Sequence, residues 1–225
     1  MTTNPIFVAV DTPDLAAASA LARAVAPHVG GIKLGLEFFM ANGPEGVRVI
    51  AALGLPIFLD VKLHDIPNTV AGALRSLAAL DLAVVNVHAG GGGAMLAAAR
   101  DACAPATKLI AVSILTSLDD ADLAAMGVPD GAAAQVARLA ALARTNGLDG
   151  IVCSPHEVAA AKAAWPSGYF VVPGVRPEGA AVGDQKRVMT PRAALGAGAS
   201  MLVIGRPISA APDPAAAAAA IAASL

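Results

Sequence analysis

Short apolar segments alternate with longer alanine- and leucine-rich segments along almost the whole chain. The short segments lie at residues 6–10, 31–35, 57–61, 84–88, 109–114, 150–153, 169–172 and 201–204. Continuous apolar runs too short for a buried helix are typical of parallel strands that are covered on both faces. The longer segments predict helices at residues 13–26, 44–52, 70–79, 93–102, 132–145, 157–164, 191–197 and 214–223. This alternation predicts a mostly parallel sheet with helical crossovers.

Start and stop signals support these helices. Thr12-Pro13 and Asp213-Pro214 each place a capping side chain before a proline, which is favoured at the first helical position. Gly54 stands where a helix is expected to end. Eight strand–helix pairs close a (β/α)8 TIM barrel, a fold of about 250 residues. We therefore expect one α/β barrel domain over residues 1–225, with an open, doubly wound sheet as the alternative.

Composition excludes several classes of protein. Of the 225 residues, 56% are hydrophobic and 14% are charged, and 15 Lys and Arg against 17 Asp and Glu give a net charge of −2. So apolar a chain is not expected to be disordered, and a near-neutral balance without a basic cluster argues against nucleic-acid binding. The charge-free stretch at residues 82–99 is interrupted by polar residues and glycines, so we expect no membrane-spanning helix.

The cysteines and the N-terminal residues predict the compartment. Cys103 and Cys153 lack the spacing of a metal site, and the first residues show no basic segment or cleavage site of a secretory signal. We therefore expect two buried thiols rather than a disulfide, and a cytoplasmic location.

Charged side chains interrupt two predicted strands near their carboxyl ends. Lys33 lies in the second strand, Asp60 and Lys62 lie at the end of the third, and Asp65 follows. Residues two apart in an extended strand point to the same face, and Lys and Asp are rarely buried unless they are paired. Because barrels place their active sites at this end of the strands, the four residues predict an alternating charge array at the site mouth, without a metal. A purely structural ion-pair cluster is the alternative.

A second group of residues predicts a phosphate site. Gly205 and Arg206 follow the last strand, and Gln185 lies in the long segment at residues 173–190 that precedes it. Barrels frequently bind phosphate after strands seven and eight, and an arginine can hold it with two hydrogen bonds. An exposed arginine in a turn is the alternative for any single Gly-Arg pair.

Weaker signals come from the glycines and histidines near the fourth strand. The run at residues 90–93 does not complete a GxGxxG pattern, so we expect it to serve helix entry and close packing. His88 faces the site mouth or has a structural role.

Residues 60–69, Asp-Val-Lys-Leu-His-Asp-Ile-Pro-Asn-Thr, contain a DxKxxD motif and strongly resemble the signature of the orotidine 5′-phosphate decarboxylase family. Further matches to that family lie at residues 8–11, 32–35, 87–89, 115–117, 172–177, 183–187 and 204–208. DxKxxD alone is shared with sugar-phosphate decarboxylases and synthases of the same barrel superfamily. The extended form with Ile-Pro-Asn-Thr is more selective.

The resemblance implies a cofactor-free decarboxylation of orotidine 5′-monophosphate to UMP and CO2 in pyrimidine synthesis. It assigns Lys62 as the proton donor to C6, with Asp60 and Asp65 beside it. It also implies a homodimer in which Asp65 and Thr69 reach into the partner's site.

The same resemblance assigns residues to the other parts of the substrate. Lys33 and Asp11 are expected to contact the ribose and the charge network, and Thr116 is expected near the pyrimidine. The residues expected at the phosphate end are Arg176, Gln185, Gly205 and Arg206.

Two other functions are weighed against this one. A metal-dependent keto-sugar-phosphate decarboxylase or synthase would use the same DxKxxD motif and would be sensitive to EDTA. A phosphate sensor on an inactive barrel is expected to lack at least one member of the charge array. Its four residues are all present, which disfavours the sensor.

Overall fold

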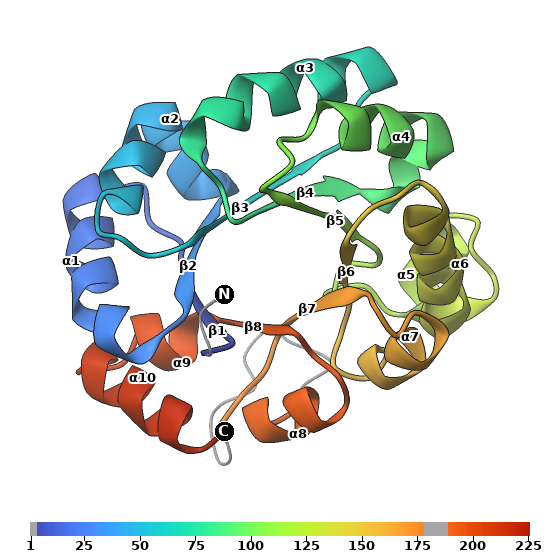
Figure 1. Cartoon of the computed structure of the whole chain (residues 1–225). Coiled ribbons are helices and arrows are strands. Elements are labelled where there is room, and N and C mark those ends of the chain that lie inside the picture. Colours follow the sequence, from blue (N-terminus) through green and yellow to red (C-terminus); the bar gives the residue numbers. More distant parts are fainter. Residues whose placement is uncertain (1–3, 178–188) are drawn as a thin grey trace.

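Eight parallel strands form a closed barrel, and helices surround it on the outside (Figure 1). The computed structural model describes residues 4–177 and 189–225. Each strand pairs with its neighbours in sequence, and β8 pairs with β1 to complete the ring. The predicted (β/α)8 TIM barrel is therefore confirmed, and closure of the ring rules out the open sheet.

The strands agree with the predicted apolar runs to within two residues at either end. They are β1 (Ile6–Val10), β2 (Gly31–Gly35), β3 (Ile57–Leu63), β4 (Val84–His88), β5 (Lys108–Val112), β6 (Gly150–Val152), β7 (Tyr169–Pro173) and β8 (Met201–Ile204). The largest differences are at β3, which runs two residues further than predicted, and at β5, which stops two residues earlier.

Within the described residues, the eight predicted helices are all present, together with two additional short α-helices. The helices are α1 (Leu15–Val25), α2 (Leu36–Ala51), α3 (Pro67–Leu77), α4 (Gly92–Ala102), α5 (Asp120–Ala125), α6 (Gly131–Thr145), α7 (Val158–Ala164), α8 (Pro191–Gly196), α9 (Arg206–Ser209) and α10 (Pro214–Ala223). The additional helices, α5 and α9, both follow carboxyl ends of strands.

The N-terminal cap of α1 differs from the prediction. The Asp14 carboxylate accepts hydrogen bonds from the backbone N–H groups of Ala16 and Ala17 at 2.8 and 3.0 Å, so the helix starts after Asp14. The predicted cap at Thr12 is wrong because its hydroxyl instead accepts from the Asp14 N–H in the preceding turn. The predicted cap of α10 is confirmed, since Asp213 accepts from the Ala216 N–H at 3.0 Å.

Helix α2 begins earlier than its predicted start at Pro44. Gly43 has a φ of +59° and breaks the helical path, so α2 consists of two helical segments that meet at a kink. Only the second segment was predicted, because proline marks its first turn and glycine interrupts the pattern before it.

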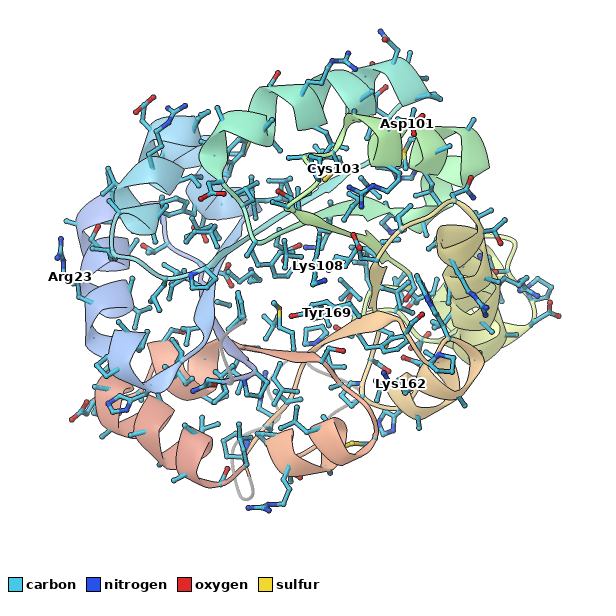
Figure 2. All side chains as sticks on the ribbon, in the orientation of Figure 1. Arg23, Asp101, Cys103, Lys108, Lys162 and Tyr169 are labelled. Carbon is cyan, nitrogen blue, oxygen red and sulfur yellow. The ribbon has the colours of Figure 1, made fainter. Side chains whose placement is uncertain are left out.

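Apolar side chains form two layers. The larger layer lies between the strands and the helices. The smaller one fills the inside of the barrel and consists of Phe7, Ala9, Phe58, Val84, Ile110, Val171, Met201 and Val203. At the amino end of the barrel, the Lys108 ammonium group lies 5.1 Å from the centre of the Tyr169 ring (Figure 2). The packed interior therefore separates this end from the carboxyl ends of the strands.

The two cysteines are free and buried, as predicted. Among the described residues, no helix is both long and apolar enough to cross a membrane. Within the same part of the chain, no group of three or more His, Cys, Asp or Glu side chains is placed to hold a metal ion.

Candidate active site

A cavity of about 500 Å³ opens at the carboxyl ends of the strands. Its floor is formed by apolar residues of the barrel interior, including Ala9, Phe58 and Val171. The charged residues that line it in the described part of the chain are Asp11, Lys33, Asp60, Lys62, Arg176 and Arg206. A polar ligand of nucleotide size therefore meets charges on the walls and an apolar base.

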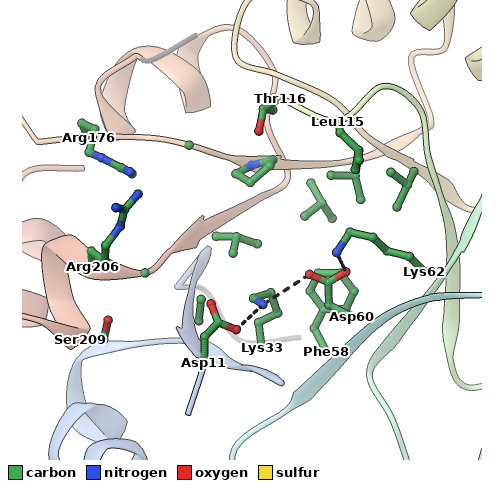
Figure 3. Close-up of a pocket in the computed structure, with 18 of the residues that line it drawn as sticks. Asp11, Lys33, Phe58, Asp60, Lys62, Leu115, Thr116, Arg176, Arg206 and Ser209 are labelled. Atoms are coloured by element: carbon green, nitrogen blue, oxygen red, sulfur yellow. Dashed lines mark hydrogen bonds and ion pairs between the residues drawn. The ribbon is translucent and has the colours of Figure 1, made fainter. Parts of the chain in front are cut away.

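Two lysines and two aspartates form a continuous network on one side of this cavity (Figure 3). The Lys33 ammonium group lies 3.0 Å from Asp11 Oδ1 and 3.4 Å from Asp60 Oδ2. The Lys62 ammonium group lies 2.7 Å from Asp60 Oδ1. Asp60 thus sits between two cations, and the predicted pairing of Lys33, Asp60 and Lys62 is confirmed.

Burial and charge act in opposite directions on Asp60, whose side chain is 13% exposed. Burial alone would raise the pKa of its carboxyl group. The charges of Lys33 and Lys62, together with hydrogen bonds from Lys62 and Asn86, outweigh burial and lower that pKa below its usual value. Asp60 is therefore ionised at neutral pH and balances the adjacent ammonium groups.

The backbone at Lys62 is not that of a regular strand. Lys62 has a φ of +49°, and the register between β3 and β4 shifts between Leu59 and Leu63. The Lys62 N–H donates to Asn86 Oδ1 at 2.7 Å instead of to the neighbouring backbone. Asp60 and Lys62 therefore meet as predicted, but a local bulge rather than simple alternation brings them together.

Gly35, at the end of β2, leaves room for the network. A Cβ atom at this position would lie 2.7 Å from Asp11 Oδ1 and 3.0 Å from Lys33 Nζ. Any larger residue would have to displace one of these two groups. Sequence reasoning placed Gly35 in a strand without assigning it this role.

Two arginines face each other across another part of the cavity (Figure 3). Arg176 follows β7 and is 9% exposed, whereas Arg206 begins α9 directly after β8 and is exposed. The Arg176 guanidinium donates to the Val175 carbonyl at 2.9 Å. Burial, and then the positive charge of Arg206, lower the pKa of Arg176. Two like charges beside one cavity favour an anionic ligand between them.

The other residues predicted for substrate binding are placed as follows. Thr116 and Gly205 line the same cavity. Among the described residues, a Cβ on Gly205 would make only an ordinary contact with Ala9, at 3.6 Å, so their packing does not demand glycine there. Gln185 lies outside the described residues.

Asp65 and Thr69 are not part of the cavity. Both are exposed, and Asp65 Oδ1 accepts from the Ile66 N–H at 2.6 Å. The predicted array of four charges is therefore incomplete within one chain: Lys33, Asp60 and Lys62 come together, but Asp65 does not line their pocket.

The histidines near the fourth strand pack against each other rather than lining the cavity. The rings of His64 and His88 stack with centroids 5.1 Å apart, and His88 Nδ1 accepts from the Gly90 N–H at 3.2 Å. This favours the structural role for His88, whose pKa is lowered by burial and by the charges of His64 and Lys62. A Cβ on Gly91 would clash with Met95 Sδ, and Gly92, the first residue of α4, has a φ of +82°, so these two glycines serve close packing and helix entry as predicted.

Sequence reasoning missed Asn86, which is fully buried and hydrogen-bonded to the charge network. A signal was present, since Asn86 is a polar residue between valines in β4. Its partners lie 24 and 26 residues earlier in the chain, so the pattern alone did not reveal its contacts.

Comparison with known proteins agrees with this geometry. The model of the orotidine 5′-phosphate decarboxylase / HUMPS family matches residues 4–221. The chain belongs to this family. It is 61% identical over 222 residues to a protein from Novosphingobium aromaticivorans named orotidine 5′-phosphate decarboxylase, and the match covers 99% of both chains.

Two further relatives have the same name. A protein from Sphingopyxis alaskensis is 58% identical over 212 residues, covering 94% of this chain and 95% of the relative. The crystal structure of orotidine 5′-phosphate decarboxylase from Lactobacillus acidophilus superposes with a TM-score of 0.83 at 36% identity, covering 97% of each chain. The resemblance in residues 60–69 therefore extends to the whole chain and to the fold.

Proposed function

We propose that this chain is a carboxy-lyase that converts orotidine 5′-monophosphate to UMP and CO2 in pyrimidine biosynthesis. The observation that supports this most directly is the Lys62 ammonium group, held 2.7 Å from Asp60 at the wall of a cavity that also contains an arginine pair. Relatives that match nearly the whole chain are named for this reaction. The metal-dependent keto-sugar-phosphate reaction is not favoured.

Lys62 is the proposed catalytic acid. When the bond between C6 and the carboxylate carbon breaks, its electron pair stays on C6 in an orbital that the ring cannot delocalise. A fixed ammonium group at that position stabilises the developing charge and then transfers a proton to C6. Asp60, ionised at neutral pH, keeps Lys62 oriented, and Lys33 links Asp60 to Asp11 and the ribose.

The remaining residues bind the ends of the substrate. Arg176, Arg206 and Gly205, together with Gln185, are proposed to hold the phosphate, and Thr116 is proposed to contact the pyrimidine. The phosphate is far from the bond that breaks, so its binding energy serves to place C6 against Lys62. Holding the reacting groups in a geometry from which they can react raises the rate by orders of magnitude.

The test is a direct assay with purified protein and orotidine 5′-monophosphate, following loss of the orotate-ring absorbance with and without EDTA. We expect equal turnover in both, because no step is assigned to a metal. Turnover that EDTA abolishes would contradict a metal-free reaction, whereas the metal-dependent alternative predicts no turnover of this nucleotide at all. Lack of turnover on this nucleotide would contradict the proposal.

We also propose a homodimer with shared active sites. Asp65 and Thr69 are exposed and outside their own chain's cavity, which leaves them available to a second copy. Exposed apolar side chains lie on the same strand-end side, with Ile66 at 66% and Leu115 at 39% exposure. A second copy over this face would bury them and complete the charge array.

Mixing two inactive variants tests the shared site. Lys62→Ala and Asp65→Ala remove residues that, in this dimer, one site takes from different chains. Random exchange of subunits makes about half of the dimers mixed, each with one intact site, so about a quarter of wild-type activity should return. Activity that stays at the level of the separate variants would mean that each site uses its own Asp65.

Two broader proposals accompany the function. We propose that residues 1–225 act as a single barrel domain, since strands from both ends of the chain pair in one ring. We also propose a cytoplasmic location, which the two free thiols and a nucleotide substrate support.

A further inference from the structure

We propose that Asn86 is a positioning residue for the decarboxylation, and that its buried side chain holds Lys62 in the backbone conformation that aims its ammonium group at Asp60 and the cavity. Asn86 does not line the cavity, so it acts through Lys62 and Asp60 rather than on the substrate. The inference rests on the proposed function and adds a residue to it.

Asn86 closes a ring of hydrogen bonds around Lys62. Its Oδ1 accepts from the Lys62 N–H at 2.7 Å, and its Nδ2 donates to Asp60 Oδ1 at 2.6 Å. The same Asp60 oxygen accepts from the Lys62 ammonium group at 2.7 Å. Both ends of Lys62, its backbone and its charge, are therefore fixed by one amide and one carboxylate.

This ring is needed because the backbone of Lys62 is strained. A φ of +49° is costly for a residue with a Cβ, and such conformations persist where the surroundings fix them. The register shift between β3 and β4 also removes Lys62 from regular backbone pairing opposite Asn86. The side-chain oxygen of Asn86, Oδ1, takes the place of the backbone carbonyl that would accept from the Lys62 N–H in a regular strand pair.

The chemistry of the site favours an amide at position 86. The position requires one acceptor for a backbone N–H and one donor for a carboxylate, and Asn supplies both at fixed separation. Asp would place a second carboxylate oxygen 2.6 Å from Asp60, where two negative charges repel. Ala would leave both partners without their hydrogen bonds and would allow Lys62 to relax toward an extended backbone.

The experiment compares Asn86→Ala and Asn86→Asp with wild-type protein, using kcat, KM, the Kd for UMP and the titration of Asp60. Asn86→Ala should lower kcat about 100-fold, because displacement of a catalytic group by about 1 Å has this effect. KM and the Kd for UMP should change little, since the residues that bind the phosphate are untouched. Carboxyl-carbon NMR of the unliganded protein should show the pKa of Asp60 rising when the Asn86 donor is lost.

Asn86→Asp tests separately the hydrogen bond from the Lys62 N–H and the hydrogen bond to Asp60. It keeps an acceptor for the Lys62 N–H but opposes Asp60 with a second carboxylate. The groups that face Asp60 are Lys33 from β2, Lys62 from β3 and residue 86 from β4, so only the last of these changes. The acidic limb of the kcat–pH profile should therefore move to higher pH, which a loss of packing alone would not produce.

Ser113→Ala is the matched control. Ser113 is fully buried, its hydroxyl donates to the Val152 carbonyl at 2.7 Å, and it lies outside the cavity lining. This variant loses a comparable buried hydrogen bond, yet kcat and the Asp60 titration should stay at wild-type values. If Asn86→Ala behaves like Ser113→Ala in both measurements, the positioning role is overturned. If wild-type protein does not turn over the nucleotide, the proposed function fails, and the Asp60 titration still decides whether Asn86 holds the network.

Discussion

The two charged clusters of the cavity differ in how their charges are balanced. In the lysine–aspartate network, the positive charges of Lys33 and Lys62 match the negative charges of Asp11 and Asp60, and the four groups lie within 3.4 Å of a partner. The arginine pair instead places two cations toward each other, and Arg206 contributes to a lowered pKa of Arg176. The first cluster is complete without substrate, whereas the second favours an anion between its members.

The balanced network suits preorganised catalysis, whereas the arginine pair suits ligand binding. Catalysis by a fixed charge requires that the charge be in place before the reaction begins, so that no reorganisation is needed as the transition state forms. In a binding site for an anion, by contrast, the repulsion between like charges should remain until the ligand relieves it. We therefore expect substitutions in the network to affect chemistry and stability, and substitutions in the arginine pair to affect affinity.

The largest expected effect is that of Lys62→Ala. Loss of the ammonium group removes both the charge that stabilises C6 and the proton that it receives, so turnover should fall below detection. Binding of UMP, measured by calorimetry, should remain, because the phosphate residues are unchanged. Retained decarboxylation by this variant would contradict the role of Lys62 and with it the contrast between the clusters.

Arg206→Ala should have the next largest effect, on kcat/KM. Hydrogen bonds to charged groups contribute about 1.5–3 kcal/mol each, so loss of this guanidinium should lower kcat/KM on the nucleotide by about 100-fold. Gln185→Ala is expected to change kcat/KM in the same direction. Steady-state kinetics with orotidine, which has no phosphate, provides the control, since that substrate should lose little. Equal efficiency of Arg206→Ala and wild-type protein on the nucleotide would remove Arg206 from the phosphate site.

Most of the barrel could be predicted from the sequence because its signals are local. Parallel strands covered on both faces appear as apolar runs, and charges within such runs, as at Lys33 and Asp60, stand out against them. The conformation of Lys62 could not be predicted, since its left-handed backbone is stabilised by a side chain 24 residues away. The strand pattern placed Asp65 at the mouth only because it follows the strand end, and it missed the exposed position, which the family resemblance anticipated by assigning Asp65 to a partner's site.

A smaller effect is expected on stability when Asp60 is replaced by Asn. This substitution leaves two ammonium groups without the carboxylate between them, and removing one partner of a buried pair costs about 3 kcal/mol. Because the pKa of folded Asp60 is lowered, its stabilisation is present at neutral pH and is lost as the pH falls through that lowered value. Urea unfolding across this range should therefore show wild-type protein and Asp60→Asn converging at acid pH. Asp101→Asn, at an exposed residue of α4, should track wild-type protein throughout.

The smallest effect is expected for Arg206→Gln in the absence of ligand. Arg206 is exposed, and substitutions at exposed positions usually change the free energy of unfolding by no more than about 0.5 kcal/mol, so we expect a change of that size in either direction. UMP should stabilise wild-type protein against urea more than it stabilises this variant, because the ligand binds the folded state through the lost group. A loss of unliganded stability as large as that of Asp60→Asn would mean that the arginine pair is a structural element like the network. Stability that changes only with the ligand would instead identify it as a site completed by an anion.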